Sequence, residues 1–184
     1  MSHVAKAYDF SDRDAAYRDL ARDLTALLSG ERDLIANAAN TAALIYDALP
    51  DLNWAGFYLY KGGELVLGPF QGKPACVRIA IGRGVCGTAA ERRATVLVED
   101  VHAFPGHIAC DSASNSEIVV PLLRGAELLG VLDIDSPKLR RFDGVDQRGI
   151  ETLARIFIES LQELRSTSEN AGEAPASVEL KNRR

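Results

Sequence analysis

The sequence predicts an α+β fold: a central, mostly antiparallel six-stranded sheet with N- and C-terminal helices packed on one face. Apolar residues recur at helical spacing in the first 49 residues and again after residue 143. Between these two segments, short apolar runs alternate with turns that contain glycine, as in antiparallel hairpins. Helices at both chain ends around a block of hairpins indicate one sheet covered by helices.

The N-terminal segment contains two predicted helices. The first covers Tyr8–Ser29, where Ser11 is a candidate N-cap and Gly30 ends the helix. The second covers Glu31–Leu49, and Pro50 closes it because proline cannot continue a helix. Each helix has one apolar face, which predicts packing on a sheet or against a second copy of the chain.

The middle of the chain contains six runs that we predict as strands. The first two form a hairpin across Lys61–Glu64, a turn with two glycines. Pro121 lies in the fifth run and predicts an edge or a bulge, because proline lacks a backbone donor. The predicted strands are Trp54–Tyr60, Leu65–Phe70, Val77–Ile81, Thr95–Val101, Glu117–Leu123 and Leu128–Asp135.

Two further helices are predicted. A short one at Thr88–Arg93 follows a tight turn at Gly82–Gly87, and a long one covers Asp143–Leu164. Residues 1–165 are therefore expected to form a single domain. Residues 166–184 contain few large apolar side chains and are expected to be a disordered tail.

The overall charge narrows the class of partner. The 184 residues carry a formal net charge of −5, which argues against a surface for nucleic acid or anionic membranes. No apolar run approaches the roughly 18 residues of a membrane-spanning helix, and the polar N-terminus lacks the apolar centre of a signal peptide. We therefore expect a cytoplasmic protein, in which a disulfide would serve catalysis or redox sensing.

The glycine-rich segment Gly82–Gly87 matches the dinucleotide-binding pattern G-x-G-x-x-G. However, only Thr88–Arg93 remains for the following helix, which is too short for a Rossmann crossover. We interpret the glycines as a turn that needs positive φ.

The histidines suggest a metal site, but the spacing does not support one. His102, His107 and Cys110 share one loop, yet the sequence lacks the close cysteine pair of structural zinc sites. We therefore expect no bound metal.

All three cysteines lie between residues 76 and 110. Cys86, in an apolar turn, fits a small buried hydrophobic residue, and Cys76 lies at the entrance of a strand. Cys110 lies in the long polar loop His102–Ser116, a type of loop that is often functional. An exposed, activated thiolate with a second thiol nearby is typical of redox chemistry in which one cysteine attacks and another resolves.

Three carboxylates are expected at one end of the sheet. Asp133 and Asp135 share one face of their strand because they are two residues apart. A hairpin centred on Gly125 would pair Glu117 with about Asp133. Clustered carboxylates suit a cationic ligand, or a raised pKa that lets one of them donate a proton, although three separate solvated acids are the simpler alternative.

Trp54 to Leu164 resembles a GAF domain, and more specifically the free methionine-(R)-sulfoxide reductases, which are stand-alone GAF proteins. The motifs that carry the resemblance are WAGFYLY, GPFQGKPAC, IGRGVCGTAA, FPGHIACDSASNSEIVVPL and GVLDIDSP, followed by F-D-x-x-D at Phe142–Asp146. These motifs contain all three cysteines and the three carboxylates.

The resemblance implies reduction of free L-methionine-(R)-sulfoxide to methionine. Cys110 would attack the sulfoxide sulfur, and Glu117 or one of the two aspartates would protonate the departing oxygen. Cys86 or Cys76 would then form a disulfide with the sulfenic acid left on Cys110. Thioredoxin would reduce this disulfide, so no cofactor is implied beyond the electrons of the thioredoxin/NADPH system.

The same resemblance implies how the substrate binds. Aromatic side chains would hold its S-methyl group, and carboxylates would hold its α-ammonium group, a charge that a peptide-bound residue lacks. Backbone N–H groups between Cys110 and Glu117 would hold the α-carboxylate. The implied substrate-binding residues are Trp54, Tyr58, Glu117, Asp133 and Asp135.

Two other classes of function stay open. A non-catalytic GAF module that binds a ligand or senses redox state would be expected to have an output domain, which is not visible in the sequence. A purely structural dimerisation domain is supported only by the two N-terminal helices, which make a homodimer a candidate assembly.

Overall fold

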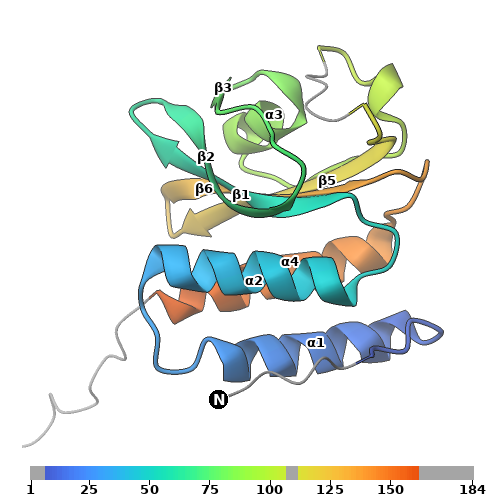
Figure 1. The fold of residues 1–184 in the computed structure, drawn as a ribbon. Coiled ribbons are helices and arrows are strands. Elements are labelled where there is room, and N and C mark those ends of the chain that lie inside the picture. Colours follow the sequence, from blue (N-terminus) through green and yellow to red (C-terminus); the bar gives the residue numbers. More distant parts are fainter. Residues whose placement is uncertain (1–6, 107–111, 162–184) are drawn as a thin grey trace, which may run out of the picture.

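The computed structural model describes residues 7–106 and 112–161, and it confirms the α+β architecture (Figure 1). Neighbouring strands are all antiparallel, in the order β3-β2-β1-β6-β5-β4. The strands are β1 (Trp54–Lys61), β2 (Glu64–Gly72), β3 (Arg78–Ala80), β4 (Val96–Val98), β5 (Ser116–Arg124) and β6 (Glu127–Ser136). The proposed tail at residues 166–184 lies outside the described residues, and the domain boundary at 165 stays a prediction.

Two of the strand predictions need comment. The fourth strand is shorter than Thr95–Val101, because a 3-10 turn, η1 (Val101–Ala103), follows it and Asp100 accepts a hydrogen bond from the His102 backbone N–H. Pro121 lies beyond the three residues of β5 that pair with β4, so its missing N–H interrupts no pairing with that strand.

Helices cover both faces of the sheet (Figure 1). α2 (Leu34–Ala48) and α4 (Gly144–Ser160) pack directly on one face, and α1 (Arg13–Leu27) lies beneath them. α3 (Gly84–Arg92) lies on the opposite face, with β3 beside it. None of the helices that the structure describes is long and apolar enough to cross a membrane.

The helices α1, α2 and α4 together form the helical layer, and each of them has an aspartate as its N-cap. Asp12 and Asp33 each accept a hydrogen bond from the backbone N–H three residues ahead, and Asp143 forms a capping box with Asp146. The prediction of Ser11 as the first cap was wrong by one residue. At an N-cap, a carboxylate oxygen accepts from the free N–H groups of the first turn and carries a charge that suits the helix dipole.

The start of α3 also differs from the prediction. The glycine-rich segment is not a turn throughout, because the helix begins at Gly84 and Cys86 lies in its first turn. Gly87 packs against the end of β3, where an added Cβ would lie 2.4 Å from the Ala80 carbonyl oxygen. Only glycine permits this approach, which brings the first turn of α3, and Cys86 with it, close to the sheet.

Apolar side chains form two clusters, one on each face of the sheet. The larger cluster lies between the sheet and the helical layer and includes Ile45 and Phe157. The smaller lies between the sheet and α3 and includes Trp54 and Cys86. Because side chains alternate along β1, Phe57 joins the first cluster and Tyr58 the second. The smaller cluster forms the apolar floor of the candidate site.

Asp146 joins the two terminal helices. Its buried carboxylate accepts from the Tyr17 hydroxyl at 2.8 Å, from Arg13 at 3.1 Å and from Arg141 at 3.2 Å. Replacing Asp146 with alanine would leave these three donors without their acceptor. The side chains of Tyr17 and Arg141 are largely out of solvent. We expect the free energy of unfolding to fall by about 3 kcal/mol, measured by urea denaturation.

The exposed ion pair between Arg155 and Glu159 on α4 provides the matched control. Glu159→Ala removes a carboxylate from the same helix, and we expect it to change the free energy of unfolding by less than about 0.5 kcal/mol. Equal losses in the two variants would contradict the role assigned to Asp146.

Candidate active site

A pocket opens between α3 and the sheet, on the face opposite the helical layer, and encloses about 530 Å³ including its part open to solvent. Six of the residues singled out in the sequence line it: Trp54, Tyr58, Cys86, Glu117, Asp133 and Asp135. Cys76 directly follows two further lining residues, Pro74 and Ala75. Cys110 and His107 lie outside the described residues, so the structure does not test their roles.

One wall of the pocket is aromatic. Trp54 is buried and stacks on Phe70 and Tyr58, with ring centroids 5.4 and 5.9 Å apart. Its indole Nε1 donates a hydrogen bond to the Lys73 carbonyl oxygen at 3.2 Å, which fixes the ring and ties the loop after β2 to it. Flat, rigid rings of this kind hold a small apolar group, such as a methyl on sulfur.

The carboxylates gather as predicted, but in a different register. Glu117 pairs with Asp135, and Val119 pairs with Asp133. The hairpin prediction was two residues off, because the turn centre lies between Gly125 and Ala126 and the register shifts at Leu122/Leu123. Asp133 and Asp135 still share one face of β6, so all three carboxylates line the pocket.

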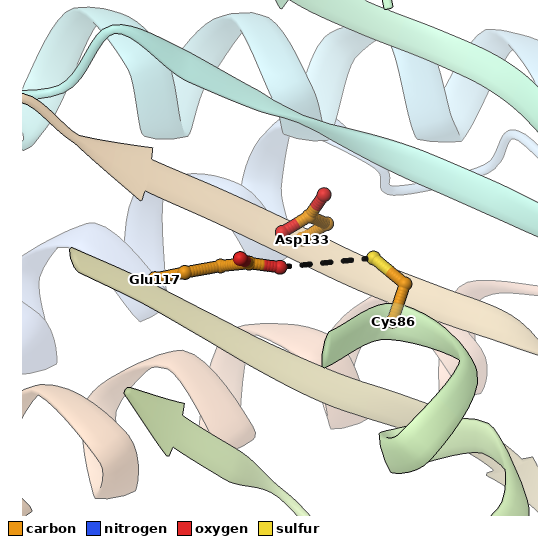
Figure 2. A group of neighbouring side chains, drawn as sticks. All are labelled: Cys86, Glu117 and Asp133. Atoms are coloured by element: carbon orange, nitrogen blue, oxygen red, sulfur yellow. Dashed lines mark hydrogen bonds between the residues drawn. The ribbon is translucent and has the colours of Figure 1, made fainter. Parts of the chain in front are cut away.

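Glu117 and Asp133 form the polar centre of the pocket with Cys86. Figure 2 shows the three side chains, from β5, β6 and α3, pointing toward one another. Both carboxylates are only 6% exposed, and Cys86 Sγ lies 4.0 Å from Glu117 Oε1. Asp133 Oδ1 is buried and has no hydrogen-bond partner among the described residues. A ligand with a proton to donate would therefore satisfy it.

Burial separates the protonation states of the two carboxylates. Desolvation, and then the charges of Asp133 and Asp135, raise the pKa of Glu117 well above its ordinary value. Desolvation also raises the pKa of Asp133, to about 6, and the neighbouring Cys86 and Glu117 side chains oppose that rise. Of the two carboxyl groups, Glu117 is therefore the one that keeps its proton to higher pH and can donate it, while Asp133 ionises first.

The two described cysteines differ in state. Cys86 is a buried free thiol, and desolvation together with Asp133 and Glu117 raises its pKa well above the ordinary value. It is therefore a thiol at neutral pH, which makes it a poor nucleophile. Cys76 is half-buried and takes part in a disulfide. The identification of Cys86 as a small buried residue is confirmed, although it lies in a helix rather than a turn.

Cys86, Glu117 and Asp133 are close enough to share one ion, because their ligand atoms lie within 4.8 Å of one another. However, the raised pKa values of Cys86 and Glu117 mean that a metal would have to displace two protons. His102 does not join this group, since its ring bonds to Asn115 at 3.0 Å in the η1 region. The described side chains are better suited to proton transfer than to metal binding.

Several lining residues were not predicted from the sequence. Lys73, Pro74 and Ala75 form part of the wall, and Arg83 and Ser114 also line the pocket. Ser114 accepts a hydrogen bond from the Asn53 amide at 2.9 Å, which ties the segment before β5 to the start of β1. The position of Lys73–Ala75 directly before Cys76 was the one signal in the sequence that could have indicated them.

Comparisons with known proteins show what this chain is similar to. A GAF domain family model matches residues 36–157. A free methionine-R-sulfoxide reductase of Escherichia coli is 58% identical over 137 residues, which cover 74% of this chain and 83% of that protein. A reductase of the same name from Saccharomyces cerevisiae is 46% identical over 142 residues, covering 73% and 79%. The structure of the Neisseria meningitidis free methionine-R-sulfoxide reductase with its substrate is 45% identical, with a TM-score of 0.81 and coverage of 86% and 96%.

Proposed function

Because the chain belongs to the GAF-domain family of free methionine-(R)-sulfoxide reductases, we propose that it reduces free L-methionine-(R)-sulfoxide to methionine. The observation that carries this proposal is the buried pair of Glu117 and Asp133 beside the aromatic wall. One pocket thus offers a proton donor, a negative charge and an apolar surface, which are the three features that a small zwitterionic sulfoxide requires.

The pocket orients the substrate by charge and by shape. Trp54 and Tyr58 hold the S-methyl group, while Asp133 and Asp135 attract the α-ammonium group. A methionine sulfoxide within a peptide has an amide in place of that cation, and it would leave the carboxylates uncompensated. This difference favours the free amino acid.

The chemistry proceeds by thiolate attack. Cys110 forms a bond from its sulfur to the sulfoxide sulfur, and Glu117 donates its proton to the sulfoxide oxygen. The oxygen then moves to the Cys110 sulfur as its bond to the methionine sulfur and the new sulfur–sulfur bond both break. Cys110 is left as a sulfenic acid, and methionine leaves with its sulfur reduced by two electrons. A solvent proton restores Glu117 after the step.

A second cysteine completes the cycle, and the structure favours Cys76 for this role. Its thiol attacks the sulfenic acid, a disulfide forms and water leaves. Cys76 is the disulfide-bonded cysteine among the described residues, whereas Cys86 is free, buried and has a raised pKa. Thioredoxin then supplies two electrons and two protons, so we propose no cofactor beyond the thioredoxin/NADPH system, in a reducing compartment such as the cytoplasm.

An NADPH-coupled thioredoxin assay with separate R and S sulfoxides tests the function. We expect turnover with the R form of free methionine sulfoxide and at least about tenfold lower kcat/KM with the S form or with a peptide-bound sulfoxide. Absence of turnover with the R form would favour the sensing module. Equal rates on free and peptide-bound substrate would contradict the ammonium-binding role of the carboxylates.

A further inference from the structure

Cys76 lies at an edge of the molecule that a protein reductant can reach. It lies two residues before the start of β3, which is an end strand of the sheet. In the described ranges, no further strand pairs with the outer side of β3. Such an edge presents unpaired backbone groups to an approaching chain.

The next residue, Val77, adds an apolar surface. Its side chain is 64% exposed, more than any other large hydrophobic residue that the structure describes. Its backbone carbonyl accepts a hydrogen bond from the Leu67 N–H at 2.9 Å, so the residue is held against β2 while its side chain faces solvent. A single exposed valine is ordinary on a surface. What sets Val77 apart from the other exposed hydrophobic residues is its position beside a disulfide-bonded cysteine.

Thiol–disulfide exchange requires the attacking sulfur to come into bonding distance of the disulfide, so the partner must cover the residues beside Cys76. We propose that Val77 and the free edge of β3 form the docking surface for a protein dithiol reductant. This inference rests on the proposed function, because it takes the disulfide of Cys76 as the species that must be reduced in each cycle.

Reduction of the disulfide takes two thiol–disulfide exchange steps. A thiolate of the reductant attacks Cys76 Sγ, forms a mixed disulfide, and releases the other cysteine of the protein disulfide as a thiolate that takes up a proton. The second thiol of the reductant loses its proton, attacks the first sulfur of the reductant, and releases Cys76 as a thiolate, which is then protonated. The enzyme gains two electrons and two protons, and the reductant becomes a disulfide.

The test compares a protein reductant with a small one. We expect Val77→Ser to lower kcat/KM for thioredoxin at least about fivefold, because an apolar contact is lost from a small interface, and to leave turnover with dithiothreitol within about twofold of the unsubstituted enzyme. Val77→Thr, which keeps the branched shape, is expected to give a loss in the same direction. Ile35→Ser is the matched control, since Ile35 is 52% exposed on α2, in the helical layer across the sheet, and it should change neither value.

Three other outcomes would contradict the proposed docking surface. An unchanged kcat/KM for thioredoxin in both Val77 variants overturns the docking surface while leaving the proposed function intact. Equal losses with thioredoxin and dithiothreitol overturn it too, because they place the effect on Cys76 itself. Absence of turnover with either reductant in the unsubstituted enzyme overturns the proposed function and the docking surface together.

A trapping experiment gives evidence that is independent of rates. A thioredoxin in which the second active-site cysteine is replaced by serine cannot resolve the mixed disulfide. Mass spectrometry of the trapped complex should show the bond at Cys76, with less complex formed by Val77→Ser than by Ile35→Ser. A bond to Cys110 instead would overturn docking at the β3 edge.

Discussion

Replacing Glu117 with glutamine is expected to lower the rate constant of methionine release about 100-fold or more in a single turnover. The amide keeps nearly the shape of the buried side chain but has no acidic proton to give to the sulfoxide oxygen. In the unsubstituted enzyme, burial raises the pKa of Glu117 well above its ordinary value, so the carboxyl group keeps its proton to higher pH. The rate constant of this step should therefore decline at alkaline pH, as Glu117 loses its proton, and the variant should lack that decline.

Glu127→Gln is the matched control for this experiment. Glu127 begins β6, the strand that carries Asp133, but its side chain is exposed and pairs with Arg124 far from the pocket. The control should keep the rate constant and the alkaline decline of the unsubstituted enzyme. A Glu117→Gln variant with an unchanged rate constant, or with the same alkaline decline, would remove Glu117 as the acid and leave Asp133 to be tested in its place.

Stability gives a second measurement on the same variant. The pKa of Glu117 is higher in the folded protein than in the unfolded chain. At acid pH both states hold the proton, and this group then does not reduce the free energy of unfolding. As the pH rises, the unfolded chain loses the proton first, and the free energy of unfolding falls. Asp133, with a pKa raised to about 6, acts in the same direction. As the pH rises above about 4.5, the ordinary pKa of a glutamate, Glu117→Gln should therefore lose less stability than the unsubstituted enzyme.

The fold was predictable from the sequence because its hairpins are local. The turn at residues 61–64 and the alternation along β1 determine which side chains face each layer. The start of α3 was not predictable in the same way, since glycine has a low helix propensity. Gly87 is helical here because α3 packs closely on the end of β3, a tertiary contact that local propensity does not reveal.

The candidate site was predictable as a set of side chains but not in its exact pairing. Strand alternation places Asp133 and Asp135 together without knowledge of the register. The register shift at Leu122/Leu123 lies opposite Gly130, whose Cβ position is filled by the Tyr58 carbonyl oxygen. Counting residues from the turn does not reveal such a steric requirement. The wall formed by Lys73–Ala75 and Arg83 depends on how loops meet across the pocket, which no local pattern encodes.

The three cysteines are expected to give three different results when each is replaced by serine. Cys110→Ser should abolish methionine release, because serine is a far weaker nucleophile toward sulfur. Cys76→Ser should release about one methionine per enzyme and then stop with thioredoxin, since the sulfenic acid has no thiol to resolve it. Cys86→Ser should continue to cycle with thioredoxin, because Cys86 is a buried free thiol with a raised pKa.

The choice of reductant separates these roles. Dithiothreitol can reduce a sulfenic acid directly, so it should restore repeated turnover to Cys76→Ser but not to Cys110→Ser. Methionine released per enzyme, counted with each reductant, is therefore the decisive measurement. If Cys86→Ser stopped after one methionine with thioredoxin while Cys76→Ser continued, Cys86 would be the resolving cysteine. The first turn of α3 would then have to move away from Glu117 during the cycle, because only an exposed Cys86 could exchange with a protein partner.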